Sequence, residues 1–589
     1  MNSAAARTFS WLLALTVPAG ALQAANGYLV RNLVSDIPFL ADNTDPNLAG
    51  AWGIAQSATS PFWISDSGVG LSTLYNSSGG VLSLAVTIPP GARGGSQGTP
   101  TGTVYNGTIG FGVGAGQAAV FLFDTWDGTI SGWNSSTDAT HAIVKVDRSA
   151  SGAIYTGLAI AATTGGSYLY AANFHAGTIE VFDANFAPVS MPFQDSALPA
   201  GFAPWNIQNL GGKLYVSYAL QNASGNSAVP AAGSGYVDVF DTSGNLLQRL
   251  VSGGVLNAPW GLAMAPSGFG DFANDLLVGN FGDGTINVFH PQTGAYLATL
   301  HDIYGSAIVI PNLRGLAAGN GGSGGDAHAV YFTAGIPGPD NGNHGLFGRL
   351  QAAPAITAAQ VVNGASFQPQ IGLNAWVAVQ GSNLASTTRT WNAGDFVNGA
   401  LPTALDGVTV TLSGKRAYIY YVSPTQLNIL IPQATPVGTI ELQTFNNGLE
   451  SGTVNIQVAS IAPAFFMWGD GKHIAATHAD GSLVAPAGST SGSPAKPGED
   501  IVLYGTGFGQ TIPPIPDGSL VTSPFPLTTT PTILFGNAGA PVAFGGLIAA
   551  GLYQINITVP LTATDGDNQV VAQVGDQTSP GNAAIPVAR

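Results

Sequence analysis

The chain has 589 residues, of which 8% are charged and 45% are hydrophobic, and its formal net charge at pH 7 is −16. Such a low charge content excludes helix bundles, which need Lys, Glu and Arg on their wet faces, and the negative charge disfavours nucleic acids and anionic membranes as partners. The 81 Gly and 38 Pro residues are typical of strands joined by tight turns, and the absence of Cys excludes disulfides and thiolate catalysis.

Residues 1–24 are predicted to be an export signal. An apolar stretch, residues 9–17, follows the single charge of Arg7 and precedes a run of small residues that ends near Ala25. This is the order of regions in a secretory signal peptide. Because no later stretch is apolar enough to cross a bilayer, we expect a secreted or otherwise extracytoplasmic protein without membrane insertion.

Residues 25–352 contain a repeated pair of strands. In each copy, a hydrophobic strand ends in Asp or Asn. After three further residues comes a Gly, and a second strand follows this Gly directly. Clear copies place this polar residue at Asp66, Asp124, Asn173 and Asn280, and two looser copies follow the same plan. Six units of about 50 residues, each with a hairpin, indicate a repeat architecture.

A second repeated element precedes the hairpins. It combines small residues with an apolar core around Trp52, Trp205, Trp260 and Arg314, which suits an innermost strand where backbones crowd around an axis. Together the two elements predict an all-β chain that begins with a six-bladed β-propeller, whose last blade is completed by residues 28–34. Seven blades with one degenerate repeat, or a series of β-sandwiches, are the alternatives.

Three segments of this region, residues 103–106, 127–134 and 169–177, carry a family resemblance. They resemble a family of exported, uncharacterised bacterial β-propeller proteins that is distantly similar to NHL-repeat propellers. The resemblance implies the fold and export, and it brings no activity with it.

The period changes after a linker at residues 351–354. The segment 426–432 recurs as 554–560, and 377–384 pairs with 501–508, which predicts two Ig-like β-sandwich domains at residues 356–459 and 460–589. They resemble Ig-like domains of the TIG type and, through residues 361–367, a C-terminal module of exported proteins from soil acidobacteria. This resemblance implies spacing, surface adhesion or dimerisation.

Propeller topology predicts where a binding site forms. In a four-stranded meander, the start of the first strand lies at the same end as the turn between the second and third strands. We therefore expect one face of the ring to carry aromatic, acidic, amide and imidazole groups. The ligand-binding candidates on it are Trp52, Trp205, Trp260, Arg314, Asp124, Asp127 and Asp283. Rings with carboxylates around them suit a sugar or an aryl group.

The same face offers candidates for catalysis and for metal binding. His175 and His344 break the repeat and are the acid–base candidates, although a buried, hydrogen-bonded histidine is the plainer interpretation. Oxygens of Asp66, Asp124, Asn173 and Asn280 are the candidate ligands for one Ca²⁺. The alternative for the repeated Asp and Asn residues is a cap on their own turn.

Two other patterns carry chemistry. Ser96 lies in a Gly-x-Ser-x-Gly pattern but has no helix after it, so a nucleophile elbow is not expected. His473 and His478, with Asp470 and Asp480 nearby, are compatible either with a metal site or with a solvated hairpin.

The sequence therefore predicts an exported, non-catalytic binding or adhesion protein that recognises a neutral glycan or an extracellular surface through the propeller mouth. The alternative is a lactonase-like hydrolase or lyase that uses Ca²⁺ in the propeller channel. A structural role in the cell envelope is the third possibility. No organic cofactor is expected.

Overall fold

The computed structural model describes residues 27–338 and 343–589, so the predicted export signal at residues 1–24 lies outside the described residues. The regular secondary structure of the described residues is almost entirely β-strand and includes no α-helix, which confirms the all-β prediction. Their three short 3₁₀ helices are η1 (Ser149–Ser151), η2 (Gly270–Phe272) and η3 (Ala393–Asp395). No helix in these two ranges is long and apolar enough to span a membrane. The chain contacts divide them into two compact units, residues 27–352 and residues 353–589.

The described part of residues 27–352 forms six main sheets, each built on an antiparallel four-stranded meander. The first three comprise β3 (Ala51–Ala55), β4 (Phe62–Asp66), β5 (Leu71–Tyr75) and β6 (Val81–Thr87); β7 (Pro100–Tyr105), β10 (Phe121–Thr125), β11 (Thr129–Trp133) and β12 (Ile143–Asp147); and β13 (Tyr155–Thr163), β14 (Gly166–Asn173), β15 (Thr178–Asp183) and β16 (Pro188–Val189). A small hairpin of β8 (Gly112–Gly114) and β9 (Gln117–Ala118) lies between β7 and β10 in the chain.

The other three sheets complete the series. They comprise β17 (Phe202–Leu210), β18 (Lys213–Leu220), β19 (Tyr236–Phe240) and β20 (Leu246–Ser252); β21 (Pro259–Met264), β22 (Leu276–Asn280), β23 (Ile286–Phe289) and β24 (Tyr296–Thr299); and β25 (Leu313–Ala318), β26 (Val330–Ala334), β27 (Leu346–Ala352), β1 (Tyr28–Ser35) and β2 (Asn43–Thr44).

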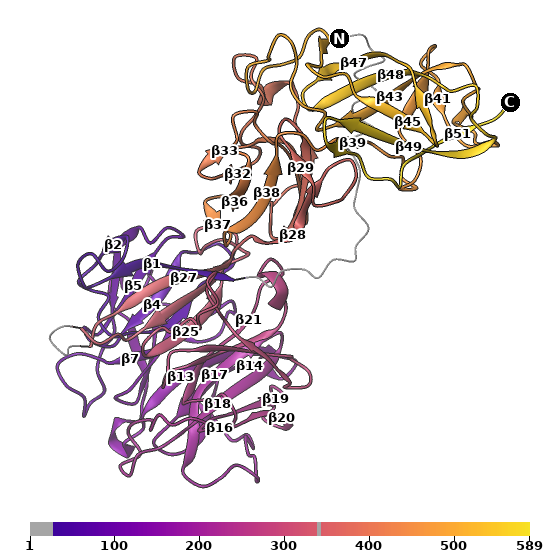
Figure 1. Ribbon diagram of the computed structural model, residues 1–589. Helices are drawn as coiled ribbons and strands as arrows, with labels where there is room; N and C mark the ends of the chain where they lie inside the picture. Colours follow the sequence, from indigo (N-terminus) through magenta and orange to yellow (C-terminus); the bar gives the residue numbers. More distant parts are fainter. Residues whose placement is uncertain (1–26, 339–342) are drawn as a thin grey trace. The chain divides into compact units, whose positions relative to one another are not determined.

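The first strands of the six sheets form a closed ring. Each of β3, β7, β13, β17 and β21 contacts the first strand of the next sheet, and β25 contacts β3. The N-terminal strand β1 pairs antiparallel with β27 and so joins the two ends of this unit in one sheet (Figure 1). A ring of radial meanders is a β-propeller, so the predicted propeller fold is confirmed.

Close backbone approach explains the small residues of the first strands. A Cβ on Gly261 would stand 2.7 Å from the carbonyl oxygen of Arg314, and one on Gly315 would stand 2.6 Å from a methyl carbon of Ile54. Between neighbouring sheets, by contrast, large apolar side chains fill the space, as where the ring of Trp63 stacks on that of Phe121 at 4.2 Å. The crowded axis and the packed layers around it both follow from closing the ring.

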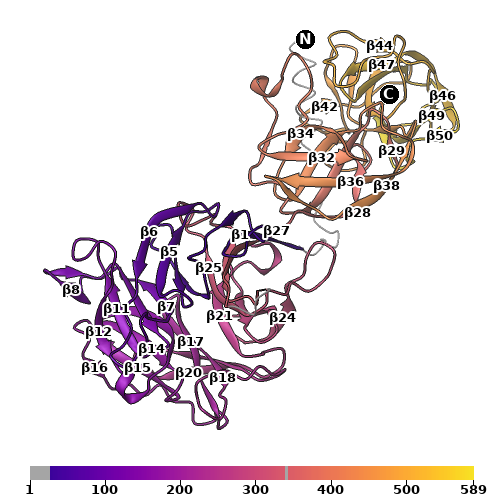
Figure 2. The same cartoon turned by 90° about the vertical axis from the view of Figure 1, so that its left-hand side faces the viewer.

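The second unit contains two pairs of sheets. The first pair comprises β28 (Ala355–Asn363), β30 (Trp376–Ser382), β35 (Gln426–Leu430), β34 (Tyr418–Val422) and β31 (Arg389–Thr390), and β29 (Ile371–Gly372), β38 (Val454–Ala459), β36 (Gly438–Asn446), β32 (Val408–Leu412), β33 (Lys415–Arg416) and β37 (Leu449–Glu450). Figure 2 shows β32, β36 and β38 side by side. One apolar cluster, which includes Val377, Ile429 and Leu442, takes side chains from both sheets.

The second pair follows in the chain. It comprises β42 (Gly492–Ser493), β41 (Leu483–Val484), β40 (Ala476–His478), β43 (Asp500–Thr506), β48 (Leu552–Thr558), β47 (Val542–Ala549), β44 (Phe525–Pro526) and β39 (Ala464–Phe465), and β46 (Ala538–Ala540), β45 (Thr532–Phe535), β49 (Gly566–Val574), β50 (Gln577–Thr578) and β51 (Ala584–Val587). The two pairs share a buried cluster around Trp376, whose indole N–H donates to the carbonyl oxygen of Ala550 at 2.8 Å.

Candidate functional site

The three tryptophans of the predicted mouth lie together in a buried cluster. Trp52, Trp205 and Trp260 are 6%, 2% and 2% exposed, and the ring centroid of Trp52 lies 6.0 Å from that of Trp205 and 6.4 Å from that of Trp260. They come from the beginnings of β3 and β21 and from the middle of β17. Their rings pack edge-on in this buried cluster, so they do not form an open platform for a ligand.

Arg314, from the start of β25, joins this cluster. Its guanidinium carbon lies 3.9 Å from the centroid of Trp52, and Nη1 donates to the backbone oxygens of Gly50 at 3.3 Å and Ala51 at 2.8 Å. Burial lowers the pKa of Arg314 to about 9, so the side chain remains a cation at neutral pH. A cation over an indole face is a favourable arrangement.

Asp66 and Asp124 are buried acids in strands β4 and β10. One oxygen of Asp66 accepts the backbone N–H of Thr73 at 3.0 Å and its hydroxyl at 2.8 Å. One oxygen of Asp124 accepts the hydroxyl of Thr101 at 2.8 Å and the N–H of Gly102 at 2.5 Å. Burial raises the pKa of Asp66 well above its usual value and that of Asp124 to about 7. Neither side chain caps its own turn. The capping role considered for the repeated Asp and Asn residues therefore does not apply to these two.

The two asparagines of the repeat bond to nearby loops, Asn173 to its own turn and Asn280 to the loop before β21. The side-chain oxygen of Asn173 accepts the N–H of Ala176 at 3.1 Å, which is a turn cap, and its amide donates to Glu180 at 2.6 Å. The side-chain oxygen of Asn280 accepts the N–H of Asn257 at 3.0 Å, and its amide donates to the backbone oxygen of Val255. Both side chains therefore stabilise backbone.

The remaining acidic candidates also hold loops in place. Asp127 accepts the N–H of Gly91 at 2.6 Å and the hydroxyl of Thr99 at 2.8 Å. Asp283 accepts the N–H of Thr285 at 3.0 Å and its hydroxyl at 2.7 Å. These carboxylates already have short hydrogen-bond partners in the fold.

The two acid–base candidates have separate surroundings. His175 is exposed in the turn after β14, with Nδ1 3.2 Å from the backbone oxygen of Gly225. Nδ1 of His344 lies 2.7 Å from a carboxylate oxygen of Asp36, beside the seam between β1 and β27. Within residues 27–338 and 343–589, no three His, Asp or Glu side chains gather closely enough to hold a metal ion.

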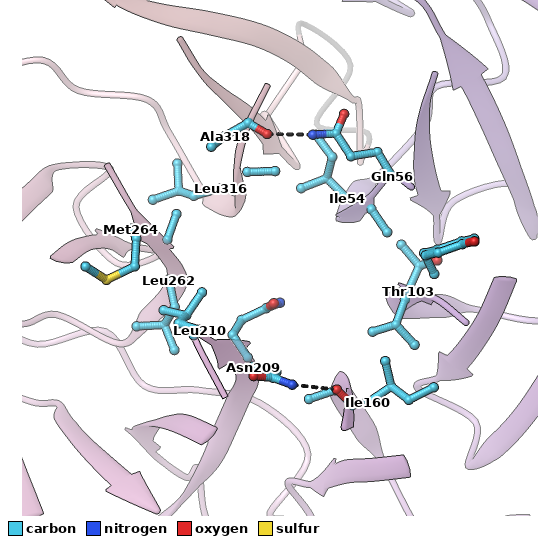
Figure 3. Close-up of a pocket in the computed structure, with 18 residues that line it drawn as sticks. Ile54, Gln56, Thr103, Ile160, Asn209, Leu210, Leu262, Met264, Leu316 and Ala318 are labelled. Atoms are coloured by element: carbon cyan, nitrogen blue, oxygen red, sulfur yellow. Dashed lines mark hydrogen bonds between the residues drawn. The ribbon is translucent and has the colours of Figure 1, made fainter. Parts of the chain in front are cut away.

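A cavity of about 550 Å³ lies at the opposite ends of the first strands (Figure 3). It is lined by the last residues of these strands and by the hairpins that follow them. The lining residues are Ile54, Ala55, Gln56, Thr103, Val104, Tyr105, Ala159, Ile160, Gln208, Asn209, Leu210, Gly211, Leu262, Ala263, Met264, Leu316, Ala317 and Ala318. A volume of this size is typical of a small-molecule site.

The wall of the cavity is apolar with a few amides and one buried hydroxyl. The Gln56 amide donates to the carbonyl oxygen of Ala318 at 2.5 Å, and the Asn209 amide donates to that of Ile160 at 2.9 Å (Figure 3). The side-chain oxygens of Gln56 and Thr103 are buried and have no hydrogen-bond partner among the described residues. No Asp, Glu, His, Lys or Arg is among the 18 lining residues.

The candidates predicted from the sequence therefore lie at one end of the ring, while the open cavity lies at the other. Trp126, Phe174 and Phe281, which were not predicted, also pack into the tryptophan cluster. A signal for two of these was present, because each of Asn173 and Asn280 is followed directly by Phe in the aligned repeats. No comparable pattern marks Gln56 or Thr103.

The rings of His473 and His478 lie against carboxylates in the second unit. The ring nitrogens of His473 lie 2.5 Å from Asp470 and 2.9 Å from Asp567, while Nδ1 of His478 lies 2.6 Å from Glu499. Because both nitrogens of His473 face carboxylates, its imidazolium form is favoured, and no free lone pair is offered to a metal. Lys472 also pairs with Asp567.

This His473 cluster predicts a pH dependence of stability. Burial lowers the pKa of His473, but the hydrogen bonds to Asp470 and Asp567 outweigh it, and the pKa lies above its ordinary value of 6.5. The stabilisation is therefore complete below about pH 6.5 and is lost as pH rises through the folded-state pKa. Calorimetric unfolding between pH 5.5 and 8.5 should show it, with about 1–2 kcal/mol lost in a His473→Gln variant at low pH.

The matched control is His301→Gln, which changes an exposed histidine of the other unit. It should leave the pH dependence of the unit of residues 353–589 unchanged. An unchanged pH dependence in His473→Gln would show that the imidazolium does not stabilise this unit.

Comparison with solved structures returns proteins of low similarity. A streptogramin B lyase matches over all of its own chain and 56% of this one, with 12% identity and a TM-score of 0.34. A glucose dehydrogenase matches over 98% of its chain and 55% of this one, with 14% identity and a TM-score of 0.35. A gluconolactonase from Xanthomonas campestris matches over 82% of its chain and 39% of this one, with 17% identity and a TM-score of 0.27. No protein-family profile matches the chain.

Sequence comparison identifies relatives in a giant virus. Uncharacterized protein R648 of Acanthamoeba polyphaga mimivirus is 33% identical over 344 residues, which are 56% of this chain and 82% of the viral protein. Uncharacterized protein L690 of the same virus is 32% identical over 344 residues, 56% of this chain and 88% of its own. These relatives are viral, and membership of the bacterial family suggested by the sequence remains a prediction. The extent and identity of these matches show that the chain belongs to the same protein family as these two mimivirus proteins.

Proposed function

We propose that the chain is a non-catalytic binding protein that takes a neutral glycan in the central cavity of its propeller. The observation that carries this proposal is the lining of the cavity, in which none of the 18 residues is acidic, basic or a histidine. General acid–base catalysis requires a proton donor or acceptor within hydrogen-bond reach of the reacting group. The cavity wall offers apolar contact and amide recognition instead.

The polar groups of the cavity suit a ligand rich in hydroxyl groups. The unpartnered hydroxyl of Thr103 in the cavity wall can both accept and donate a hydrogen bond, whereas the side-chain oxygen of Gln56 lies beside Gly324. Apolar walls from Ile54, Leu262 and Leu316 match the C–H faces of a sugar ring. A buried polar group without a partner costs free energy, and a ligand hydroxyl relieves that cost.

We also propose the number of blades, the domain boundaries and the export signal. The six sheets are taken as six propeller blades at residues 25–352, and the paired sheets as two Ig-like domains of the TIG type at residues 356–459 and 460–589. Residues 1–24 are taken as the export signal of a secreted or extracytoplasmic protein. Support comes from the closed ring of first strands, the two apolar clusters of the second unit and the order of regions at the N-terminus. The second unit then spaces or docks the propeller on an extracellular surface.

A Thr103→Val substitution tests the cavity. Valine keeps the shape of threonine but removes the unpartnered hydroxyl, so the unliganded protein should gain about 1 kcal/mol of stability. Binding of a neutral saccharide should weaken about tenfold, because its hydroxyl loses a hydrogen bond of about 1.4 kcal/mol. An array of neutral and acidic glycans identifies the ligand, and calorimetric titration of wild type and variant measures the difference.

Ser217→Ala is the matched control, since it removes another buried, unpartnered hydroxyl from β18, outside the cavity lining. It should leave saccharide binding unchanged. The proposal is wrong if no neutral glycan binds, or if Thr103→Val and Ser217→Ala behave alike in titration. Ca²⁺-dependent turnover of a lactone would favour the hydrolase or lyase alternative.

A further inference from the structure

Arg314 is a buried cation that has no anionic partner among residues 27–338 and 343–589. It is 6% exposed, and among the described residues only the backbone oxygens of Gly50 and Ala51 accept hydrogen bonds from it, both from Nη1. Nε is buried with no acceptor, and Nη2 donates to no described group. Buried charges in proteins are normally paired or hydrogen-bonded throughout, because removing them from water is costly.

The unused donors lie along one edge of the guanidinium. Nε–H and the adjacent Nη2–H point in the same direction, and this fork matches the two oxygens of a carboxylate. Nη2 is not among the buried unpartnered atoms, so this end of the fork meets solvent first. The opposite edge is occupied by the backbone oxygens of the β3 segment.

Further unpartnered donors belong to the same cluster. The indole N–H groups of Trp52 and Trp205 are buried and have no acceptor among the described residues. Trp52 carries the guanidinium on its face, and Trp205 contacts Trp52 edge-on. Arg314, Trp52 and Trp205 can only donate hydrogen bonds. They therefore gather at a place where no oxygen of the described residues accepts from their free N–H groups.

The rim of the cluster is aromatic and partly open. Trp126 and Phe281 are half-buried there, with the Trp126 centroid 5.4 Å from that of Trp52 and the Phe281 centroid 5.9 Å from the guanidinium carbon. Gly335 borders the guanidinium, and a Cβ at this position would collide with it. Aromatic rings therefore surround the guanidinium, and Gly335, which has no side chain, leaves room for it.

We propose that Arg314 and the tryptophans around it form a carboxylate-binding site at the end of the ring opposite the glycan cavity. The carboxylate oxygens accept from Nη2 and Nε of Arg314, and the body of the ligand packs on Trp126 and Phe281. The ligand is an organic acid, either a free aromatic or aliphatic acid or a uronic acid residue of an acidic glycan. This site is independent of the glycan proposal, because it shares no side chain with the cavity lining.

Titration of the full chain with four probes tests the site. Benzoate and glucuronate carry the carboxylate, while benzamide and glucose are their uncharged counterparts. We expect saturable binding of at least one acid, with a change in tryptophan fluorescence because the guanidinium lies on Trp52, and at least tenfold weaker binding of its uncharged counterpart. Benzoate alone indicates a free aromatic acid, and glucuronate alone indicates an acidic glycan.

The variant Arg314→Met keeps an unbranched apolar side chain and removes the charge and the donors of the guanidinium. It should bind the acid at least tenfold more weakly, while Arg416→Met, an exposed arginine of the other unit, should bind it as wild type does. If Arg314→Met does not fold, competition of the acid by sulfate in the wild-type chain supplies the second measurement. The proposal is overturned if neither acid binds saturably, if each acid and its uncharged counterpart bind alike, or if sulfate does not compete.

Discussion

A Trp260→Ala variant is expected to lose about 3–5 kcal/mol of stability in the unit of residues 27–352, which is the usual cost of truncating a buried tryptophan. Trp260 is 2% exposed and contacts the rings of the axial cluster. Its indole N–H donates to the backbone oxygen of Thr156 at 2.8 Å, and its own backbone oxygen accepts the Asn206 amide at 2.7 Å. The substitution therefore opens a cavity at the point where three sheets meet. Calorimetric unfolding of the variant and the wild-type chain measures the loss.

Tyr296→Ala is the control for this substitution, because Tyr296 lies on β24 with 49% of its surface exposed. Its cost should stay below about 1 kcal/mol. Equal, small losses in the two variants would show that the tryptophan cluster does not hold the ring together.

A chain that lacks β1 is expected to lose the folded propeller altogether. Tyr28, Leu33 and Val34 of this strand are at most 1% exposed, and the Tyr28 hydroxyl donates to the backbone oxygen of Phe269 at 2.9 Å. Burial of three large side chains contributes about 5 kcal/mol or more, before the ladder to β27 is counted. This is comparable with the whole stability of a typical domain. A chain that begins at Asp36 should show greatly increased proteolysis of residues 36–352.

Addition of a peptide of residues 27–35 should restore protection, because the peptide supplies the strand that β27 lacks. A peptide with Leu33→Asp and Val34→Asp is the control and should not restore it, since it places charges at buried positions. Full protection of the truncated chain without peptide would contradict the closing role of β1.

The sequence revealed the hairpins because each repeat carries its own local pattern. Asn173 and Asn280 stand at corresponding strand ends and make loop contacts within a few residues or with the preceding loop, so short-range pattern was sufficient to place them. Asp66 and Asp124 occupy the same repeat position but bond to Thr73 and Thr101 on neighbouring strands. These threonines are not part of the repeated motif. The motif alone therefore wrongly suggested that the two aspartates cap their own turns.

The repeat pattern did not predict how exposed the candidate site residues are to solvent. Trp52 and Trp260 were expected on one face, and the structure brings them together, but it turns their rings toward one another in a buried cluster. Whether rings at an axis face solvent or each other depends on the diameter of the closed ring, which no single repeat specifies. The cavity depends on the same diameter, since its walls include a residue as small as Ala159.

By itself, the sequence determined the all-β class, the propeller and the hairpin positions, because alternation of apolar residues and Gly turns acts over a few residues. Only the tertiary structure decided which end of the ring is filled and which is open. Six first strands converge on one axis. Three tryptophans and Arg314 fill one end of the ring, while the side chains at the other end leave a cavity of about 550 Å³ between them. Which end is filled depends on side chains from six strands that are spread over about 300 residues. These side chains meet only when the ring is closed.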